Sequence, residues 1–190
     1  MTSHPLRAYY DVVDPLSWLV SEEIAALGEE AGEVEWIPFE VRPPPAPLVS
    51  LDDPAVEARW QEARALLPGD ASPFDPPLLV PWSRKAHELV LHASTRDRSD
   101  EVRARLQRAY LFEARDIGRV DVLVEEAVAV GLDRTEAKAV LDVDKHDAEV
   151  AALRSAAVAA GVRVTPTLAL GDRRLEGFHN RAAIRTFLGT

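Results

Sequence analysis

Residues 8–18 read AYYDVVDPLSW and contain the strand-to-helix junction that decides the fold. Residues 8–13 form a short run of mostly aromatic and β-branched residues, which is typical of a β-strand. Asp14 and Pro15 follow as a helix N-cap and a proline at the first helical position. The apolar residues after Ser17 recur at helical spacing, which predicts a helix that continues to Gly32.

A second strand is predicted over residues 34–41, and it completes a βαβ unit that ends in the proline-rich stretch 42–47. From Asp53 to about Gly161 the pattern is almost wholly helical, broken by a loop at residues 68–82. Helix starts in this block are predicted at Asp53, Ser83, Ser99 and Asp133.

Strand texture returns near the C-terminal end of the chain. A strand is predicted over residues 162–170, then a turn, a returning strand at 173–176 and a last helix capped by Asn180. The chain thus reads as a single α/β domain of the order βαβ…ββα. Its halves are residues 1–50 and 150–190, and a large all-α insertion occupies residues 51–149.

The composition excludes several classes of function. The chain has 22 lysine and arginine residues against 32 aspartate and glutamate residues, and a net charge of −10. A field of that sign repels phosphate backbones and anionic lipids, so no nucleic-acid or membrane partner is expected. No apolar run approaches the roughly 18 residues of a membrane span, and no signal peptide is visible, so we expect a cytoplasmic protein. The absence of cysteine excludes thiolate chemistry, disulfides and cysteine-ligated metals.

Taken together, these segments resemble the DsbA family of thioredoxin-fold proteins, particularly its FrnE-like branch. They are also similar to the related 2-hydroxychromene-2-carboxylate isomerases and kappa-class glutathione transferases. The matching segments, in order, are 10–18 (YDVVDPLSW), 36–43 (WIPFEVRP), 108–117 (RAYLFEARDI), 161–167 (GVRVTPT) and 177–180 (GFHN). The resemblance implies a thioredoxin fold with the helical insertion, and a cis proline at Pro166 opposite the start of the first helix.

The chain departs from these relatives at the residues that carry their chemistry. The resemblance places Asp14 where the oxidoreductases have their nucleophilic cysteine, and Ser17 where they have the resolving cysteine. In the glutathione-dependent isomerases and transferases, the Asp14 position is typically a serine that hydrogen-bonds the glutathione thiolate. A carboxylate at a helix N-terminus instead caps the helix and repels an incoming thiolate.

The candidate site residues are weighed against simpler structural roles. Asp14 is interpreted first as a helix cap and second as an acid/base carboxylate, and Ser17 is the only candidate nucleophile. Thr165 and Pro166 are expected to form a ligand-binding loop beside Asp14, with an ordinary trans proline as the alternative. Trp18 and His179 are further candidate contacts to a ligand.

No metal site is expected, because the five histidines show no ligand spacing. Two functions stay open. The first is a redox-inactive protein that binds a peptide or small-molecule ligand in a cleft formed by Asp14, Ser17, Trp18, Thr165, Pro166 and His179, with no cofactor. The second is an isomerase or transferase that uses glutathione, Ser17 and the Thr165 backbone. The sequence leaves open whether the protein is an enzyme and whether it forms a homodimer.

Overall fold

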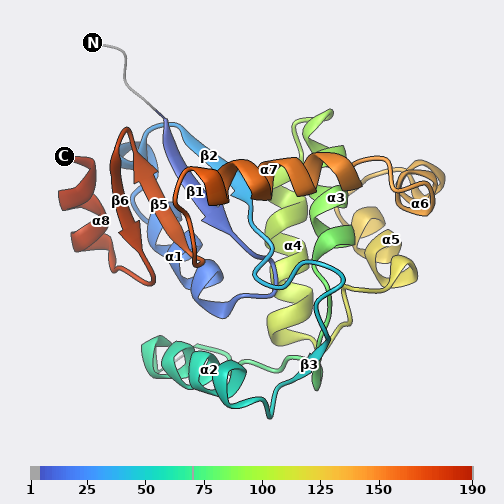
Figure 1. Ribbon diagram of the computed structural model, residues 1–190, viewed down its shortest axis with the longest axis horizontal. Coiled ribbons are helices and arrows are strands. Elements are labelled where there is room, and N and C mark those ends of the chain that lie inside the picture. The colour runs from blue at the N-terminus through green and yellow to red at the C-terminus, as the bar shows by residue number, and fades with distance from the viewer. Residues whose placement is uncertain (1–4, 70, 190) are drawn as a thin grey trace.

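The computed structural model describes residues 5–69 and 71–189, and its centre is a four-stranded sheet in the order β2-β1-β5-β6 (Figure 1). The strands are β1 (Leu6–Tyr10), β2 (Val34–Pro38), β5 (Thr167–Leu170) and β6 (Arg173–Glu176). β1 runs parallel to β2 and antiparallel to β5, and β5 pairs antiparallel with β6. This is the expected thioredoxin-like arrangement, with a βαβ unit joined edge to edge to a ββα unit.

Side chains of β1 alternate between the two faces of this sheet, as the period of two requires. On one face, Leu6 and Ala8 pack with α1 (Pro15–Ala25) and α8 (Arg181–Leu188). On the other face, Tyr9 packs with Ala157 of α7 (Asp147–Ala159). The sheet is therefore covered on both sides and forms the middle layer of the domain.

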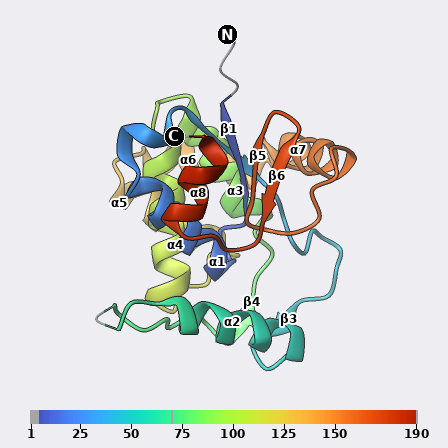
Figure 2. The same ribbon diagram turned by 90° about the vertical axis from the view of Figure 1, so that its left-hand side faces the viewer.

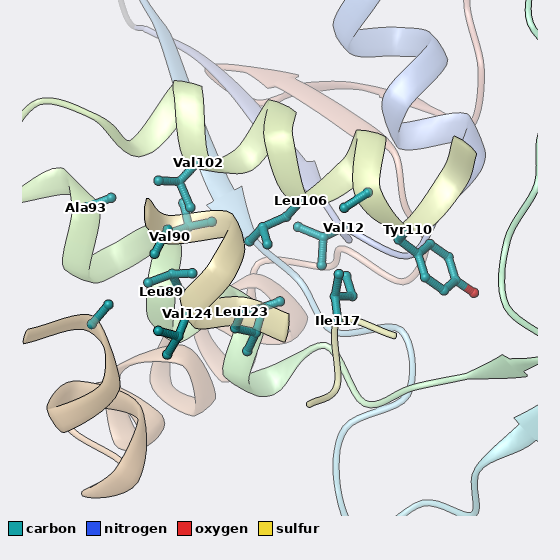
Figure 3. Close-up of a cluster of buried hydrophobic side chains, with 14 of the residues drawn as sticks. Val12, Leu89, Val90, Ala93, Val102, Leu106, Tyr110, Ile117, Leu123 and Val124 are labelled. Carbon is teal, nitrogen blue, oxygen red and sulfur yellow. The ribbon is translucent and has the colours of Figure 1, made fainter. Parts of the chain in front are cut away.

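The helical block lies beside the sheet and packs against the end of β1 (Figure 1). Its helices are α3 (Arg84–Ser94), α4 (Ser99–Phe112), α5 (Val120–Ala129) and α6 (Arg134–Asp142). Figure 3 shows Val12, which follows β1, among buried side chains of the block such as Leu89, Leu106 and Leu123. One cluster of buried apolar residues therefore joins the end of β1 to the helical block.

Helix α2 (Pro54–Leu66) stands apart from the block, at the bottom of the molecule in both views and below the start of α1 (Figures 1 and 2). A short ribbon of β3 (Val49–Ser50) and β4 (Leu79–Val80) lies close to it. Trp60 anchors α2 in the main core, where its ring packs edge-on against Phe74. This position brings α2 across one end of the sheet.

Four expected elements differ in their bounds from those observed. The first strand is Leu6–Tyr10 rather than residues 8–13, because its pairing with β2 ends at Tyr10 and the chain then turns into α1. The first helix ends at Ala25, because Gly28 takes a positive φ of 57° and a short 3₁₀ turn, η1 (Gly28–Ala31), follows. β2 ends at Pro38 rather than Val41, where the chain leaves the sheet edge. β5 begins at Thr167 rather than Val162, because residues 164–166 bend around the proline.

The predicted caps at Asp53, Asp133 and Asn180 are confirmed, since each side chain accepts a hydrogen bond from a first-turn N–H. The predicted loop at residues 68–82 contains β4, which was not foreseen. The expected boundary at residues 149–150 falls near the start of α7, a helix that contacts both α3 and β2. Within the described ranges, none of the helices has the length and hydropathy needed to cross a bilayer.

Candidate functional site

The turn between β1 and α1 is held by the side chain of Asp14. Its Oδ1 accepts a hydrogen bond from the Leu16 N–H (3.3 Å) and its Oδ2 accepts one from the Ser17 N–H (3.2 Å). Pro15 occupies the first helical position, where a residue without an N–H loses no hydrogen bond. The N-cap expected from the sequence is therefore present, and it satisfies two N–H groups that would otherwise lack a partner.

A second element, α2, places Arg59 against the same carboxylate. Nε of Arg59 donates to Asp14 Oδ1 and Nη2 donates to Oδ2, both at 3.0 Å, which makes a two-pronged ion pair. Asp14 is 5% exposed and the Arg59 side chain 31% exposed, so the pair is shielded from water on one side only. The sequence offered no signal for this contact, because the partners lie 45 residues apart.

The loop that precedes β5 closes the site from the third direction. The Thr165 hydroxyl donates to Asp14 Oδ2 (2.9 Å), and the Thr165 carbonyl oxygen accepts a hydrogen bond from Nη2 of Arg59. The Thr165–Pro166 peptide bond is cis, and the Pro166 carbonyl accepts a hydrogen bond from the Gly177 N–H (2.8 Å). Asp14, Arg59 and Thr165 therefore form one hydrogen-bonded cluster, which joins α1, α2 and the proline loop.

Ser17 belongs to this cluster but is turned away from solvent. Its hydroxyl donates to Asp14 Oδ2 (2.7 Å) and accepts from the Asp11 N–H (3.3 Å), and the residue is 1% exposed. No lysine or histidine side chain is hydrogen-bonded to this hydroxyl within residues 5–69 and 71–189. Its proton thus points to a carboxylate that already accepts from several other donors, which suits a structural role better than nucleophilic attack.

A second buried carboxylate belongs to Asp11, three residues before Asp14. It was not singled out from the sequence. Its Oδ2 accepts a hydrogen bond from the Val41 N–H (2.8 Å), and its Oδ1 lies 3.2 Å from Nε2 of His87 on α3. Asp11 and His87 are 1% and 0% exposed. Through these contacts Asp11 fixes the chain that leaves β2 and ties it to the helical block.

Two buried tyrosines lie near Asp11. Tyr10 and Tyr110 are both fully buried, and neither hydroxyl has a hydrogen-bond partner in the described parts of the chain. Burial raises the pKa of both phenols well above the usual range, and the nearby Asp11 carboxylate raises it further. The phenols therefore stay neutral and act as part of the core.

A partly open cavity of about 270 Å³ lies beside these carboxylates and is called the Asp14–Thr165 cleft from here on. Residues from the β1–α1 turn, the segment after β2, the first turns of α2, the start of α3 and the proline loop line it. They are Asp11, Val13, Asp14, Pro15, Val41, Arg42, Ala55, Val56, Arg59, Trp60, Val80, Pro81, Ser83, Arg163, Val164 and Thr165. Most of this lining is apolar, as in a small-molecule site.

The structure thus brings together part of the site that was predicted from the sequence. Asp14 and Thr165 line the cleft, whereas Ser17 and Pro166 are buried and are not among its lining residues. Trp18 is half-buried and packs edge-on against Phe112. His179 follows β6, where its Nε2 lies 3.0 Å from the Glu176 carbonyl oxygen. Neither Trp18 nor His179 is among the cleft residues.

The cleft-lining arginines were missed from the sequence. Arg42, Arg59 and Arg163 come from three separate segments, and only the folded chain brings them to one cavity. No cluster of histidine, aspartate and glutamate suitable for a metal ion is present in the described ranges. The arrangement can therefore supply an apolar surface, hydrogen bonds and positive charge to a bound molecule.

Comparison with known proteins places this geometry in a family. The model of the DSBA-like thioredoxin domain matches residues 6–188. The uncharacterized protein YwbO of Bacillus subtilis (strain 168) is 32% identical over 184 aligned residues, which cover 93% of this chain and 91% of that protein.

Solved structures agree on the fold. A probable DsbA oxidoreductase, SCO1869 from Streptomyces coelicolor, matches with a TM-score of 0.82 at 20% identity, covering 96% of this chain and 87% of that chain. A 2-hydroxychromene-2-carboxylate isomerase matches with a TM-score of 0.75 at 17% identity, covering 97% of this chain and 94% of that chain.

Proposed function

The chain belongs to the family of DSBA-like thioredoxin domains, and on that premise we propose that it binds a ligand rather than exchanging disulfides. The ligand is a peptide segment or a small organic molecule, and it occupies the Asp14–Thr165 cleft. The observation that carries this proposal is the partly open, mostly apolar cavity of about 270 Å³ beside Asp14 and Thr165. Cavities of this kind are where proteins usually bind small molecules.

The lack of disulfide exchange follows from chemistry. Exchange requires a thiolate that attacks a disulfide sulfur, and this chain has no cysteine. Insulin reduction and refolding of reduced ribonuclease should both proceed as they do in buffer alone. Activity above buffer that persists through repurification would contradict this part of the proposal.

Binding in the cleft is tested by a screen of small organic molecules and tripeptides with two-dimensional NMR of the labelled protein. We expect hits that shift the methyl signals of Val13, Val56 and Val164 together. Ala55 is exposed and lines the cleft, so Ala55→Trp should fill the cavity and abolish those shifts. Val143→Trp, at an exposed position after α6, is the matched control and should leave binding unchanged. Hits that bind Ala55→Trp as well as the parent would place the site elsewhere.

The remaining predicted contacts have a place in this proposal. Ser17 and Pro166 support the wall formed by Asp14 and Thr165, while Trp18 and His179 would touch only a ligand that extends beyond the cleft. The proposal requires no cofactor. A homodimer and a cytoplasmic location remain expectations, which light scattering and cell fractionation would test.

A glutathione-dependent isomerase or transferase is the second candidate function. The likeness of the fold to 2-hydroxychromene-2-carboxylate isomerase favours it. The hydrogen bonds of Asp14 and Ser17 argue against it, because the turn holds a carboxylate where a thiolate would need stabilising. We expect calorimetry to detect weak glutathione binding or none. A dissociation constant for glutathione in the millimolar range or below would favour the enzyme instead.

A further inference from the structure

The Asp14–Thr165 cleft is also lined by polar groups that the fold leaves wholly or partly unused. Arg42, Arg163 and Ser83 all line the cavity, and they come from three different segments. Within residues 5–69 and 71–189, neither arginine forms an ion pair, and neither Arg42 nor the Ser83 hydroxyl makes a hydrogen bond. Such groups at a cavity wall are available to a ligand.

Arg42 is held at the cavity by the segment that leaves β2. The Val41 N–H donates to Asp11, so the backbone beside Arg42 is fixed on one side. Glu40 is fully buried, and its carboxylate pairs with Arg84 at 2.8 Å. The Glu40 carbonyl also accepts a hydrogen bond from Arg154 (2.8 Å). The chain around Arg42 is therefore ordered before any ligand arrives, which lowers the entropic cost of binding.

Arg163 is oriented by the end of α7. Its Nη1 donates to the carbonyl oxygens of Val158 (2.6 Å) and Val162 (2.9 Å), and these bonds hold the guanidinium in place. Its other nitrogen donors have no acceptor among the residues described. The positive charge of Arg163 is therefore both fixed in position and free of an acidic partner.

Ser83 adds a hydroxyl at the first turn of α3. The residue is 2% exposed and is the N-cap of this 11-residue helix, yet its side chain makes no capping bond. The first N–H groups of a helix lack intrahelical partners and carry a partial positive charge. A hydroxyl without a hydrogen-bond partner among the described residues therefore lines the same cavity as the unpaired Arg42 and the partly satisfied Arg163.

The acidic residues of the cleft do not cancel this charge. Asp14 is paired with Arg59, and Asp11 accepts from the Val41 N–H and lies against His87. The charge that remains on the cavity wall is positive, although the whole chain carries −10. The rest of the lining is apolar, including Val13, Val56, Val80 and Val164.

We propose that the Asp14–Thr165 cleft is specific for a small organic anion with an apolar body, whose charged head group binds Arg42, Arg163 and Ser83. This inference rests on the proposed function and names the class of its ligand. Hydrogen bonds from a guanidinium to an oxyanion are the strongest that the cleft can offer, so they decide its selectivity. The valine side chains bury the apolar part of the ligand.

The test compares probes that share a chain length but differ in charge. Octanoate, 1-octanol and octylammonium are titrated into the full chain and followed by calorimetry, with acetate as a head group that has no apolar body. We expect octanoate to bind about tenfold or more tightly than octanol, because charge-assisted hydrogen bonds contribute beyond apolar burial. Octylammonium should bind most weakly of the eight-carbon probes, and acetate more weakly than octanoate.

Variants assign the selectivity to the named residues. Arg42→Ala and Ser83→Ala should each weaken octanoate binding and leave octanol binding unchanged, with Arg42→Ala losing about tenfold. Arg42→Lys keeps the charge and should recover part of that loss. Arg108→Ala, which removes an exposed arginine of the helical block, is the matched control and should change nothing.

The outcomes separate this inference from the proposed function. Equal affinity for octanoate and octanol, both blocked by Ala55→Trp, would leave a binding cleft but overturn its anion specificity. Failure of octanoate to bind, while other molecules or tripeptides perturb the cleft residues, would likewise overturn only this inference. Binding that persists in Ala55→Trp would count against both. Octanoate selectivity that survives Arg42→Ala and Ser83→Ala would also overturn the assignment.

Discussion

The residues at the start of α1, called the α1 wall here, and the other polar residues of the Asp14–Thr165 cleft use their polar atoms in opposite ways. On the α1 wall, the Asp14 carboxylate accepts from backbone N–H groups, from Ser17, from Thr165 and from Arg59. Elsewhere in the cleft lining, Arg42, Arg163 and Ser83 keep donors that no described residue satisfies. The hydrogen bonds around Asp14 are therefore complete, and they contribute to stability.

This contrast shows that reactivity and binding capacity can be separated within one cleft. A carboxylate in an N-cap stabilises the helix that a thiolate would otherwise use for its own activation. A carboxylate in place of a thiol leaves a cavity beside it, which residues of the segment after β2, of α2 and of the proline loop also line.

The largest effect is expected from introducing two cysteines at the start of α1. The double variant Asp14→Cys, Ser17→Cys places Cys-Pro-Leu-Cys at the start of α1 on an otherwise unchanged chain. We expect it to form an intramolecular disulfide and to gain insulin-reducing activity over a background equal to buffer. Thiol titration and mass spectrometry under oxidant provide the measurement. Thiols that stay free would mean that the turn lacks the geometry needed for exchange.

Removing the carboxylate alone should cause the largest loss of stability. Asp14→Ala deletes the N-cap and leaves Arg59 without its partner, so the free energy of unfolding should fall by about 2–4 kcal/mol. The lower half of that range reflects the partial exposure of Arg59 to water, which screens its charge. Asp14→Asn keeps a capping oxygen and should lose less. Urea unfolding of the three proteins decides this, and equal midpoints would contradict the observed cluster.

An arginine–carboxylate group on the surface of the helical block gives the scale for comparison. Arg105 donates to both carboxylate oxygens of Glu113 at 2.8 and 2.6 Å, and the Glu113 side chain is 31% exposed. Glu113→Gln should therefore cost only about 0.5–1 kcal/mol at neutral pH, well below Asp14→Ala.

The stability difference between the parent and Glu113→Gln should depend on pH, and the sign of that dependence follows from the pKa of Glu113. Hydrogen bonds from Arg105 lower the pKa of Glu113 below its ordinary value of 4.5. A carboxylate whose pKa is lower in the folded state stabilises the protein above the unfolded value, and that contribution is lost as pH falls through the folded value. The difference between parent and Glu113→Gln should therefore shrink below pH 4.5. A difference that grows in acid would contradict this assignment.

The smallest effect on stability is expected from Arg42, which lines the cleft without a partner among the described residues. Arg42→Ala removes no ion pair and no hydrogen bond to a described residue, so the free energy of unfolding should change by less than about 0.5 kcal/mol. The same variant is expected to lose anion binding, so a group that matters little for stability would matter for the ligand. A loss near that of Asp14→Ala would show that Arg42 has a structural partner.

Much of the fold could be predicted from local sequence. Proline after Asp14, the caps at Asp53, Asp133 and Asn180, and the βαβ…ββα order all come from residues close together in the chain. The ends of the strands were less predictable. Whether Val41 or Val162 continues a strand depends on the edge of the sheet and on the proline loop, and neither is encoded in a run of neighbouring residues.

The sequence by itself determined that this chain cannot exchange disulfides, because that chemistry needs an element the chain does not contain. It also determined that Asp14 caps a helix, because capping joins residues only a few positions apart. Only the tertiary structure decided that Arg59 reaches Asp14 and that Arg42, Ser83 and Arg163 share a cavity. The physical reason is distance along the chain: a side chain's charge partner and exposure depend on packing between elements that are remote in sequence.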